Sequence, residues 1–222
     1  MGIDLGGEMG KWKQKDALKR NPFLKAIEIK DDDQLDEFRQ KALRLIGVDF
    51  PLSYLKQGMV RGFLNSSNEI VGGYALVTSG PFRTVRSLPD KSYLTYKENE
   101  LFEVTALFID KSVKQCSLRT FFWFHFAKDV FSIKNKKYYI YAYGLYNKKL
   151  RNLYSKARPD IIYRGPVKML EGNIKEERES IEVAKVSTMR FFPFLALPSV
   201  TKRMLYSQNS FVKNLKPVQV IA

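Results

Sequence analysis

The sequence has little cysteine or histidine and no long hydrophobic run. Its 222 residues include one cysteine, Cys116, and one histidine, His125. A single cysteine excludes an internal disulfide and fits a reducing cytoplasm, and this pair of residues does not build a His- or Cys-based zinc site. No apolar run reaches about 18 residues, which argues against a transmembrane helix, and residues 1–20 lack the apolar core of a signal peptide. We therefore expect a cytoplasmic protein without a metal.

Positive charge is in excess. The chain has 38 Lys and Arg residues against 23 Asp and Glu residues, a formal net charge of +15. Such a chain attracts an anionic partner at long range. The candidates are nucleic acid, an anionic membrane, a nucleotide cofactor such as coenzyme A, and an acidic acyl carrier protein, and charge alone does not choose among them. The basic residues are spread along the chain, which disfavours a nucleic-acid-binding tail.

Hydrophobic periodicity and turn signals predict a mixed succession of strands and helices. Helices are expected at 35–46, 117–133 and 147–154, and strands at 26–30, 58–65, 69–78, 101–110, 138–145, 161–163 and 181–192. This order predicts an α/β or α+β sheet with helices on both faces. We divide the chain into an N-terminal arm (1–24), one domain (25–192) and a C-terminal extension (193–222).

One stretch carries a recognisable motif. Residues 138–154, YYIYAYGLYNKKLRNLY, begin with an aromatic run typical of a buried strand. Asn147 follows, and Leu150, Leu153 and Tyr154 then have the spacing of a short helix. This pattern resembles the last conserved motif of the GCN5-related N-acetyltransferase (GNAT) superfamily. The resemblance implies an acyl-transfer enzyme whose fold is a mixed, mostly antiparallel central sheet with helices on both faces.

The predicted helix start at 112–120, SVKQCSLRT, follows a strand directly. Helix N-termini present unpaired N–H groups and a positive dipole end, which suit a phosphate. In GNAT enzymes the corresponding loop binds the coenzyme A pyrophosphate, and the resemblance assigns cofactor binding here to Lys114, Gln115, Ser117 and Arg119. Both glycines of that loop are missing, so Lys114 and Arg119 would bind the phosphate through their side chains. An ordinary capped helix with exposed cations is an equal alternative.

A second resemblance lies upstream. The segments NEIVGGYALVTSGPF (68–82), LFEVTALFI (101–109) and LDEFRQKALRLIGVDFP (35–51) resemble the acyl-homoserine-lactone synthases and the N-acyl amino acid synthases. The matching positions are Arg39, Gly72 or Gly73, Leu76, Thr78, Pro81, Glu103 and Thr105. Two arginines of that pattern are Ala75 and Ala106 here, which argues against synthesis of a homoserine lactone.

The resemblance implies roles for several residues. Acyl transfer to an amine needs a base for the amine and a proton for the leaving thiolate. Glu103 is the candidate base, with a strand-end ion pair as the alternative, and Tyr154 is the candidate proton donor, with aromatic packing as the alternative. Asn147 would bind the pantetheine arm or cap a helix. The backbone of Leu107, Phe108 and Ile109 would pair with pantetheine amides as an added strand does.

Substrate binding is assigned to residues on several elements. They are Arg39, Thr78, Thr105, Phe122 and Tyr143. Phe122 belongs to the aromatic segment FFWFHF, which predicts either core packing or one wall of a long acyl-chain pocket.

The sequence thus predicts an N-acyltransferase that moves a long fatty acyl group to the amine of an amino acid, a small amine or a peptide. The donor and co-substrate would be acyl-CoA or an acyl-phosphopantetheine on an acyl carrier protein. The carrier protein is slightly preferred, because the loop glycines are missing and the basic chain would attract an acidic carrier protein. One rival is a non-catalytic GNAT-fold module that binds a carrier protein or nucleic acid. Another is a membrane-surface protein that binds lipid through residues 189–203.

Overall fold

The computed structural model describes residues 25–111, 113, 116–173 and 178–190, and among these it leaves the side chains of 116–118, 149, 153 and 190 undescribed. Helices and strands alternate in the order that the sequence predicts. The strands are β1 (Lys25–Ile29), β2 (Gly58–Leu64), β3 (Ile70–Val77), β4 (Leu101–Ile109), β5 (Tyr138–Gly144), β6 (Asp160–Pro166) and β7 (Arg178–Lys185). The α-helices are α2 (Asp32–Ile46), α3 (Leu52–Leu55), α4 (Arg83–Arg86), α5 (Cys116–Ser132) and α6 (Lys148–Tyr154). Four short 3-10 helices complete the described chain: η1 (Lys91–Tyr93), η2 (Glu98–Glu100), η3 (Ser155–Ala157) and η4 (Val186–Arg190).

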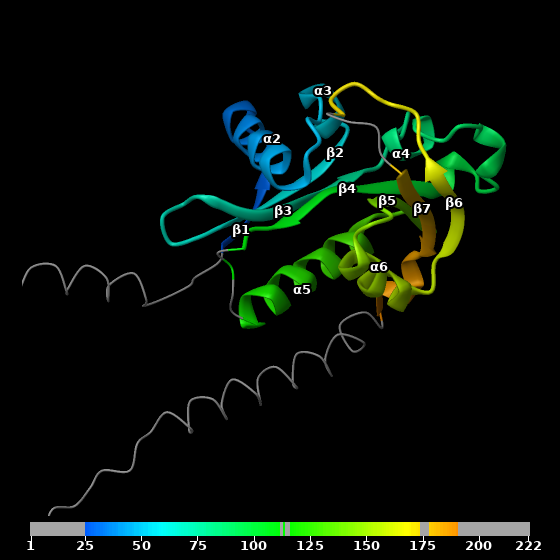
Figure 1. Cartoon of the computed structure of the whole chain (residues 1–222). Coiled ribbons are helices and arrows are strands. Elements are labelled where there is room, and N and C mark those ends of the chain that lie inside the picture. Colours follow the sequence, from blue (N-terminus) through cyan, green and yellow to red (C-terminus); the bar gives the residue numbers. More distant parts are fainter. Residues whose placement is uncertain (1–24, 112, 114–115, 174–177, 191–222) are drawn as a thin grey trace, which may run out of the picture.

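The strands form one seven-stranded sheet in the order β1-β2-β3-β4-β5-β7-β6. Neighbouring strands are antiparallel except β4 and β5, which are parallel. The sheet has helices on both faces, with α2 and α3 on one face and α5 and α6 on the other (Figure 1). The predicted mixed, mostly antiparallel sheet is therefore confirmed.

The parallel pair β4–β5 is short. Its register runs only from Leu101 opposite Tyr138 to Glu103 opposite Ile140. Beyond Glu103, β4 continues to pair with β3, whereas β5 continues to pair with β7. The two central strands consequently separate after Glu103 and leave an opening in the middle of the sheet.

A β-bulge lies on β4 beside this opening. The register with β3 passes from Thr105 opposite Ala75 to Phe108 opposite Gly73, so two residues of β4 face one residue of β3. Ala106, within the bulge, has a left-handed φ of 49°. A bulge leaves one residue outside the ladder and bends its strand, so the backbone of β4 is turned away from regular pairing where it borders the opening.

Helix α2 covers the first face of the sheet. Asp31 caps its start, since its carboxylate accepts from the backbone N–H of Asp33 at 3.0 Å and of Gln34 at 3.2 Å. Gly47 ends it with a φ of 84°. Leu35, Phe38 and Ala42 form its buried stripe and join a core shared with α3, α4 and the sheet.

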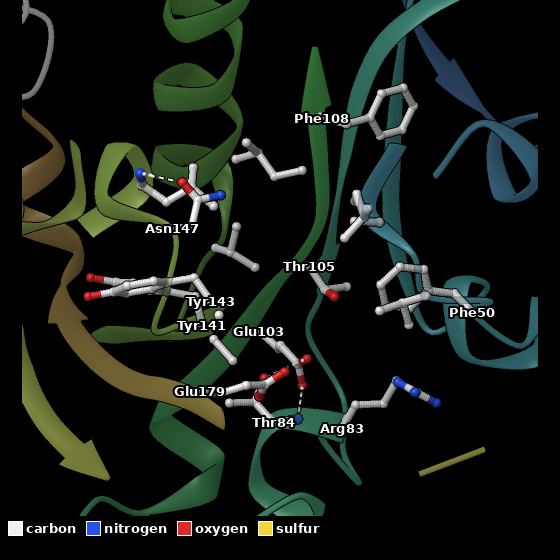
Figure 2. A pocket seen from close by; sticks show the side chains of 18 of the residues that line it. Phe50, Arg83, Thr84, Glu103, Thr105, Phe108, Tyr141, Tyr143, Asn147 and Glu179 are labelled. Carbon is white, nitrogen blue, oxygen red and sulfur yellow. Dashed lines mark hydrogen bonds between the residues drawn. The ribbon is translucent and has the colours of Figure 1, made fainter. Parts of the chain in front are cut away.

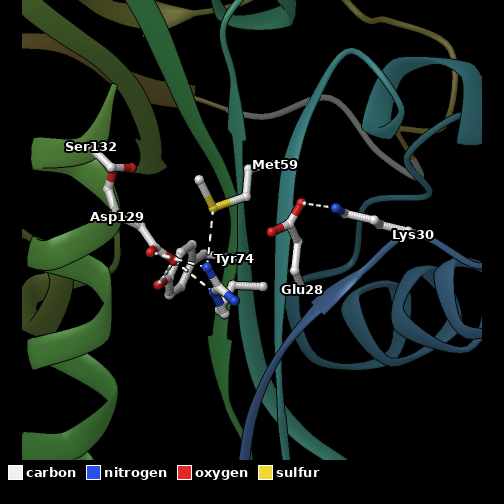
Figure 3. Close-up of polar contacts among 7 residues, drawn as sticks. Glu28, Lys30, Met59, Tyr74, Asp129 and Ser132 are labelled. Carbon is white, nitrogen blue, oxygen red and sulfur yellow. Dashed lines mark hydrogen bonds and ion pairs between the residues drawn. The ribbon is translucent and has the colours of Figure 1, made fainter. Parts of the chain in front are cut away.

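Helix α5 covers the second face. Phe122 is buried against Phe63 and Tyr74, with ring centroids 4.7 Å and 5.5 Å away. Phe124 points outward and is 61% exposed, so the aromatic segment is buried on one side rather than all round. Asp129 fixes the helix to β2 through Arg61, Nε–Oδ2 2.7 Å and Nη2–Oδ1 3.0 Å (Figure 3).

Two sequence predictions of secondary structure were wrong. The strand predicted at 181–192 ends at Lys185, and η4 follows it. Helices α3 and α4 were not predicted, because each spans a single turn and carries too few residues to show a period. No described helix is both long and apolar enough to cross a membrane. The predicted arm 1–24, the extension 193–222 and the candidate lipid-binding residues 191–203 lie outside the described residues, and the three-part division of the chain stays a prediction.

Candidate active site

The opening between β4 and β5 leads into a cavity of about 540 Å³. Its walls come from β4, β5, α6, the start of α4, and the C-terminal end of α2 with the loop that follows it. Figure 2 shows the tyrosines of β5 and Asn147 on one side of β4, and Phe50 and Phe108 on the other. The cavity thus passes through the sheet and reaches both of its faces.

Glu103 lies where β4 and β5 part. Its side chain is buried, with a relative exposure of 1%. Oε1 accepts from the Thr84 hydroxyl at 2.8 Å, and Oε2 accepts from the Thr84 backbone N–H at 3.2 Å. Burial raises the pKa of the Glu103 carboxyl, while hydrogen bonds from Tyr54 and Thr84 and the charge of Arg83 act against that rise. The site therefore holds a carboxyl group whose pKa is shifted toward neutral pH.

Arg83 begins α4 next to Thr84. It is 8% exposed and lines the cavity. Its guanidinium lies over the ring of Phe50, 5.6 Å from the centroid, and Nη2 donates to Oδ1 of Asn173 at 2.9 Å. A basic group and a carboxyl group therefore share the wall of the cavity on the α2 face of the sheet.

An apolar wall continues from this point toward the end of α2. It is formed by Leu45, Ile46, Val48, Phe50 and Leu170. Leu45 and Ile46 remain 41% and 37% exposed, so the wall reaches the protein surface. Exposed apolar side chains that border a cavity are typical of a binding site for an apolar group.

The opposite face of the sheet carries a ring of tyrosines. Tyr141 and Tyr143 are buried, and their hydroxyls donate to the carboxylate of Glu182 at 2.9 Å and 2.7 Å. Tyr154 on α6 packs on both, with ring centroids 4.6 Å and 5.4 Å away. Burial raises the pKa of Tyr154, and neighbouring Tyr139 and Glu182 add to the rise. The phenol is therefore protonated at neutral pH and is able to donate a proton.

Asn147 joins β5 to α6. Its side-chain oxygen accepts from the backbone N–H of Leu150 at 3.2 Å, as a helix cap does. The same residue lines the cavity. The capping bond fixes the amide at the cavity wall, so the two roles considered from the sequence are compatible in one side chain.

Most of the residues assigned from the sequence meet at this cavity. Those that line it are Glu103, Thr105, Leu107, Phe108, Ile109, Tyr143, Asn147 and Tyr154. They come from β4 on one side and from β5, α6 and the loop between them on the other, and the cavity lies where the two strands separate.

Other assigned residues lie elsewhere. Arg39 is on α2, where Nε lies 3.0 Å from Asp36 and 3.5 Å from Asp49, and neither Arg39 nor Thr78 lines the cavity. Phe122 lies in the core under β3, not at the cavity. The Arg119 Nε donates to the Val113 carbonyl at 3.2 Å, which ties the loop before α5 to the first turn of the helix.

The rest of the predicted phosphate loop is beyond the described part of the structure. Lys114 and Gln115 lie outside the described residues, and the side chain of Ser117 is among those left undescribed. Their assignment to cofactor binding stays a prediction. Within the described ranges no group of three or more His, Cys, Asp or Glu residues lies together in a way that could hold a metal ion.

Sequence reasoning missed the α4 side of the cavity. Arg83 and Thr84 stand between Pro81 and Ser87 in a stretch that reads as a polar loop. The usable signal was local: an Arg-Thr pair flanked by Phe82 and Val85, both of which are buried. A polar pair between buried apolar residues indicates a segment that faces the protein interior.

The structure is similar to solved structures of N-acyltransferases. The N-acyl amino acid synthase FeeM from uncultured soil microbes matches with a TM-score of 0.57 at 15% identity, covering 80% of this chain and 98% of that chain. Arabidopsis thaliana NAA60 in complex with acetyl-CoA matches with a TM-score of 0.53 at 9% identity, covering 74% and 99%. A GCN5-related N-acetyltransferase from Brucella melitensis matches with a TM-score of 0.51 at 10% identity, covering 81% of this chain and 83% of that chain. No protein-family model and no curated protein matches the sequence.

Proposed function

We propose that this chain, which has the GNAT fold, is an N-acyltransferase that moves an acyl group from a thioester to an amine. The observation that carries the proposal is the cavity at the parted strands β4 and β5, with Glu103 on one face of the sheet and Tyr154 on the other. A base and a proton donor on opposite sides of one opening are what an acyl transfer between two substrates requires. The acceptor is the amine of an amino acid, a small amine or a peptide.

The thioester donor would enter along the free side of β4. Residues Leu107, Phe108 and Ile109 have no registered partner on β5 among the described residues, and all three line the cavity. Pantetheine carries two amides in an extended arm, so it can add to this edge as a strand does. Asn147, held in place as the α6 cap, would supply a side-chain hydrogen bond to the same arm.

The chemistry follows from the two titratable groups. The amine nitrogen attacks the thioester carbonyl carbon, so that a C–N bond forms and the C–S bond breaks. Glu103, in its ionised form, takes the proton that the amine loses, directly or through a water molecule. Tyr154 donates its phenolic proton to the leaving thiolate. The raised pKa of the Glu103 carboxyl suits a general base, because the carboxyl then titrates nearer to neutral pH. The phenol of Tyr154 is protonated at neutral pH, so it has a proton to donate.

Two features bear on the donor. The net charge of +15 and the absence of both loop glycines favour an acidic acyl carrier protein over coenzyme A. The apolar wall formed by Leu45, Ile46, Val48, Phe50 and Leu170 suits a fatty acyl chain better than an acetyl group. We place the reaction in the cytoplasm, where thioester donors are made and Cys116 stays reduced.

The proposal is tested by turnover. The purified protein is incubated with acyl-CoA and acyl-carrier donors from acetyl to hexadecanoyl and with amino acid, amine and peptide acceptors, and thiol release is followed. We expect release that depends on both substrates. Glu103→Gln should abolish most of it, while Glu28→Gln, an exposed carboxylate paired with Lys30 at 3.2 Å (Figure 3), should not. Binding of donors without any turnover would favour the non-catalytic module instead.

A further inference from the structure

Arg83 is a buried cation on the wall of the cavity. Only 8% of it is exposed. The guanidinium lies against two aromatic rings, 5.6 Å from the centroid of Phe50 and 5.9 Å from that of Tyr54. In Figure 2 its side chain extends toward the Phe50 side, away from the tyrosines of β5. These rings fix the direction of the side chain and leave its charge to be balanced by something else.

The described residues do not balance that charge. None of the ion pairs within 4.0 Å among them includes Arg83. Among the described residues its guanidinium donates to the neutral amide of Asn173, at 2.9 Å. Glu103 and Glu171 act on it only from beyond ion-pair distance, and both carboxylate oxygens of Glu103 accept from Thr84. Burial accordingly lowers the pKa of Arg83. Among the residues that the structure describes, this buried guanidinium therefore has no paired anion.

The place of the missing anion is defined by the neighbouring residue. Thr84 follows Arg83 directly and donates both its N–H and its hydroxyl to Glu103. The cation and the candidate base therefore stand at adjacent positions of one short helix, on the same wall of the cavity. A ligand that contacts both residues needs an amine for Glu103 and an anionic group for Arg83.

We propose that Arg83 binds the carboxylate of the acceptor, so that the acceptor is a free α-amino acid rather than a simple amine or a peptide N-terminus. In an α-amino acid the amine and the carboxylate share one carbon, whereas a peptide N-terminus offers only a neutral amide beside its amine. A guanidinium matches the planar carboxylate through two parallel N–H donors. This inference rests on the proposed N-acyltransferase function and narrows its acceptor class.

The test uses matched acceptors with the unmodified protein. For the phenylalanine, leucine and serine skeletons, kcat/KM is measured for the amino acid, its amide and the decarboxylated amine, with whichever thioester donor the protein consumes. For at least one skeleton we expect kcat/KM for the amino acid to exceed the values for its amide and its amine by about 100-fold or more. Both analogues lack the carboxylate, and a buried charged group that is left unpaired disfavours them strongly. Equal kcat/KM for the amino acid, its amide and the amine would overturn the inference. That result is expected if a carboxylate of the protein itself pairs with Arg83.

Variants then connect the preference to this side chain. Arg83→Gln should lower kcat/KM for the amino acid by about 100-fold and leave the amine within a few-fold, removing the preference. Arg83→Lys should retain part of it, and Arg86→Gln, an exposed arginine on the same helix, should leave it unchanged. An equal loss for acid and amine would overturn the role of Arg83 while leaving the proposed function intact. Failure to consume any donor with any acceptor would instead overturn the proposed function, and the inference with it.

Discussion

The ion pair between Arg61 and Asp129 offers a quantitative test of how α5 is held on the sheet (Figure 3). Asp129 accepts two bonds from Arg61, at 2.7 Å and 3.0 Å, and one from the Tyr74 hydroxyl at 2.9 Å. The two charged side chains are only 16% and 5% exposed. Arg61→Met keeps the apolar stem but leaves a buried carboxylate with a single donor, so we expect a loss of about 3 kcal/mol in the free energy of unfolding, at the lower end for a broken buried pair.

The assay is urea denaturation followed by circular dichroism at pH 7. Asp129→Asn keeps the volume and removes the charge, and we expect it to cost about 2 kcal/mol because the freed guanidinium still reaches water at its exposed edge. The double variant should cost less than the sum of the two, with a coupling of about 2 kcal/mol. Lys128→Gln, an exposed neighbour on the same helix, is the control and should stay within about 0.5 kcal/mol. Additive effects, or a loss below about 0.5 kcal/mol for Arg61→Met, would refute the reasoning.

Further predictions concern Glu103 and Tyr154 at the candidate site and the turn at Gly172. Glu103→Gln should lower kcat by about 100- to 10,000-fold. In the wild type, activity should rise with pH as the Glu103 carboxyl loses its proton, at a pH above the usual glutamate range because its pKa is raised. The variant should lack this rise. A raised pKa in the folded state makes the Glu103 contribution to stability disappear as pH rises through that value, so Glu103→Gln should melt higher than wild type at pH 8. Tyr154→Phe should lower kcat by about 10- to 100-fold, with Tyr93→Phe as an exposed control, and an unchanged rate would remove the phenol from the mechanism. Gly172→Ala should cost about 2 kcal/mol or more in a denaturation titration, because φ is 84° and the new Cβ would lie 1.7 Å from the Asp49 carbonyl oxygen.

Much of the fold was predictable because its signals are local. The strand at 138–144 shows a run of aromatic and β-branched residues, and α2 shows a capping aspartate, an apolar stripe and a terminal glycine. Each of these patterns is written in a few adjacent residues. The two single-turn helices left no such pattern and were missed.

The candidate site was predictable only where motif and geometry coincide. Glu103 was assigned at the start of a strand, and Asn147 and Tyr154 were assigned from the strand–helix motif at 138–154; all three line the cavity. Phe122 was placed there by its aromatic neighbours, but aromatic content does not say which side of a helix faces a sheet and which faces a pocket. Arg83 has only the weak local signal of a polar pair between Phe82 and Val85, and its guanidinium packs against Phe50 and Tyr54, which are distant in sequence.

Transfer of the acyl group is the central claim, and identifying the product tests it most directly. The protein is incubated with a ¹³C-labelled acyl thioester and an amino acid mixture, and the products are resolved by mass spectrometry. The account predicts a labelled N-acyl amino acid from the wild type and from Glu28→Gln, and almost none from Glu103→Gln. Labelled free fatty acid alone, or an intact thioester in every reaction, would contradict it.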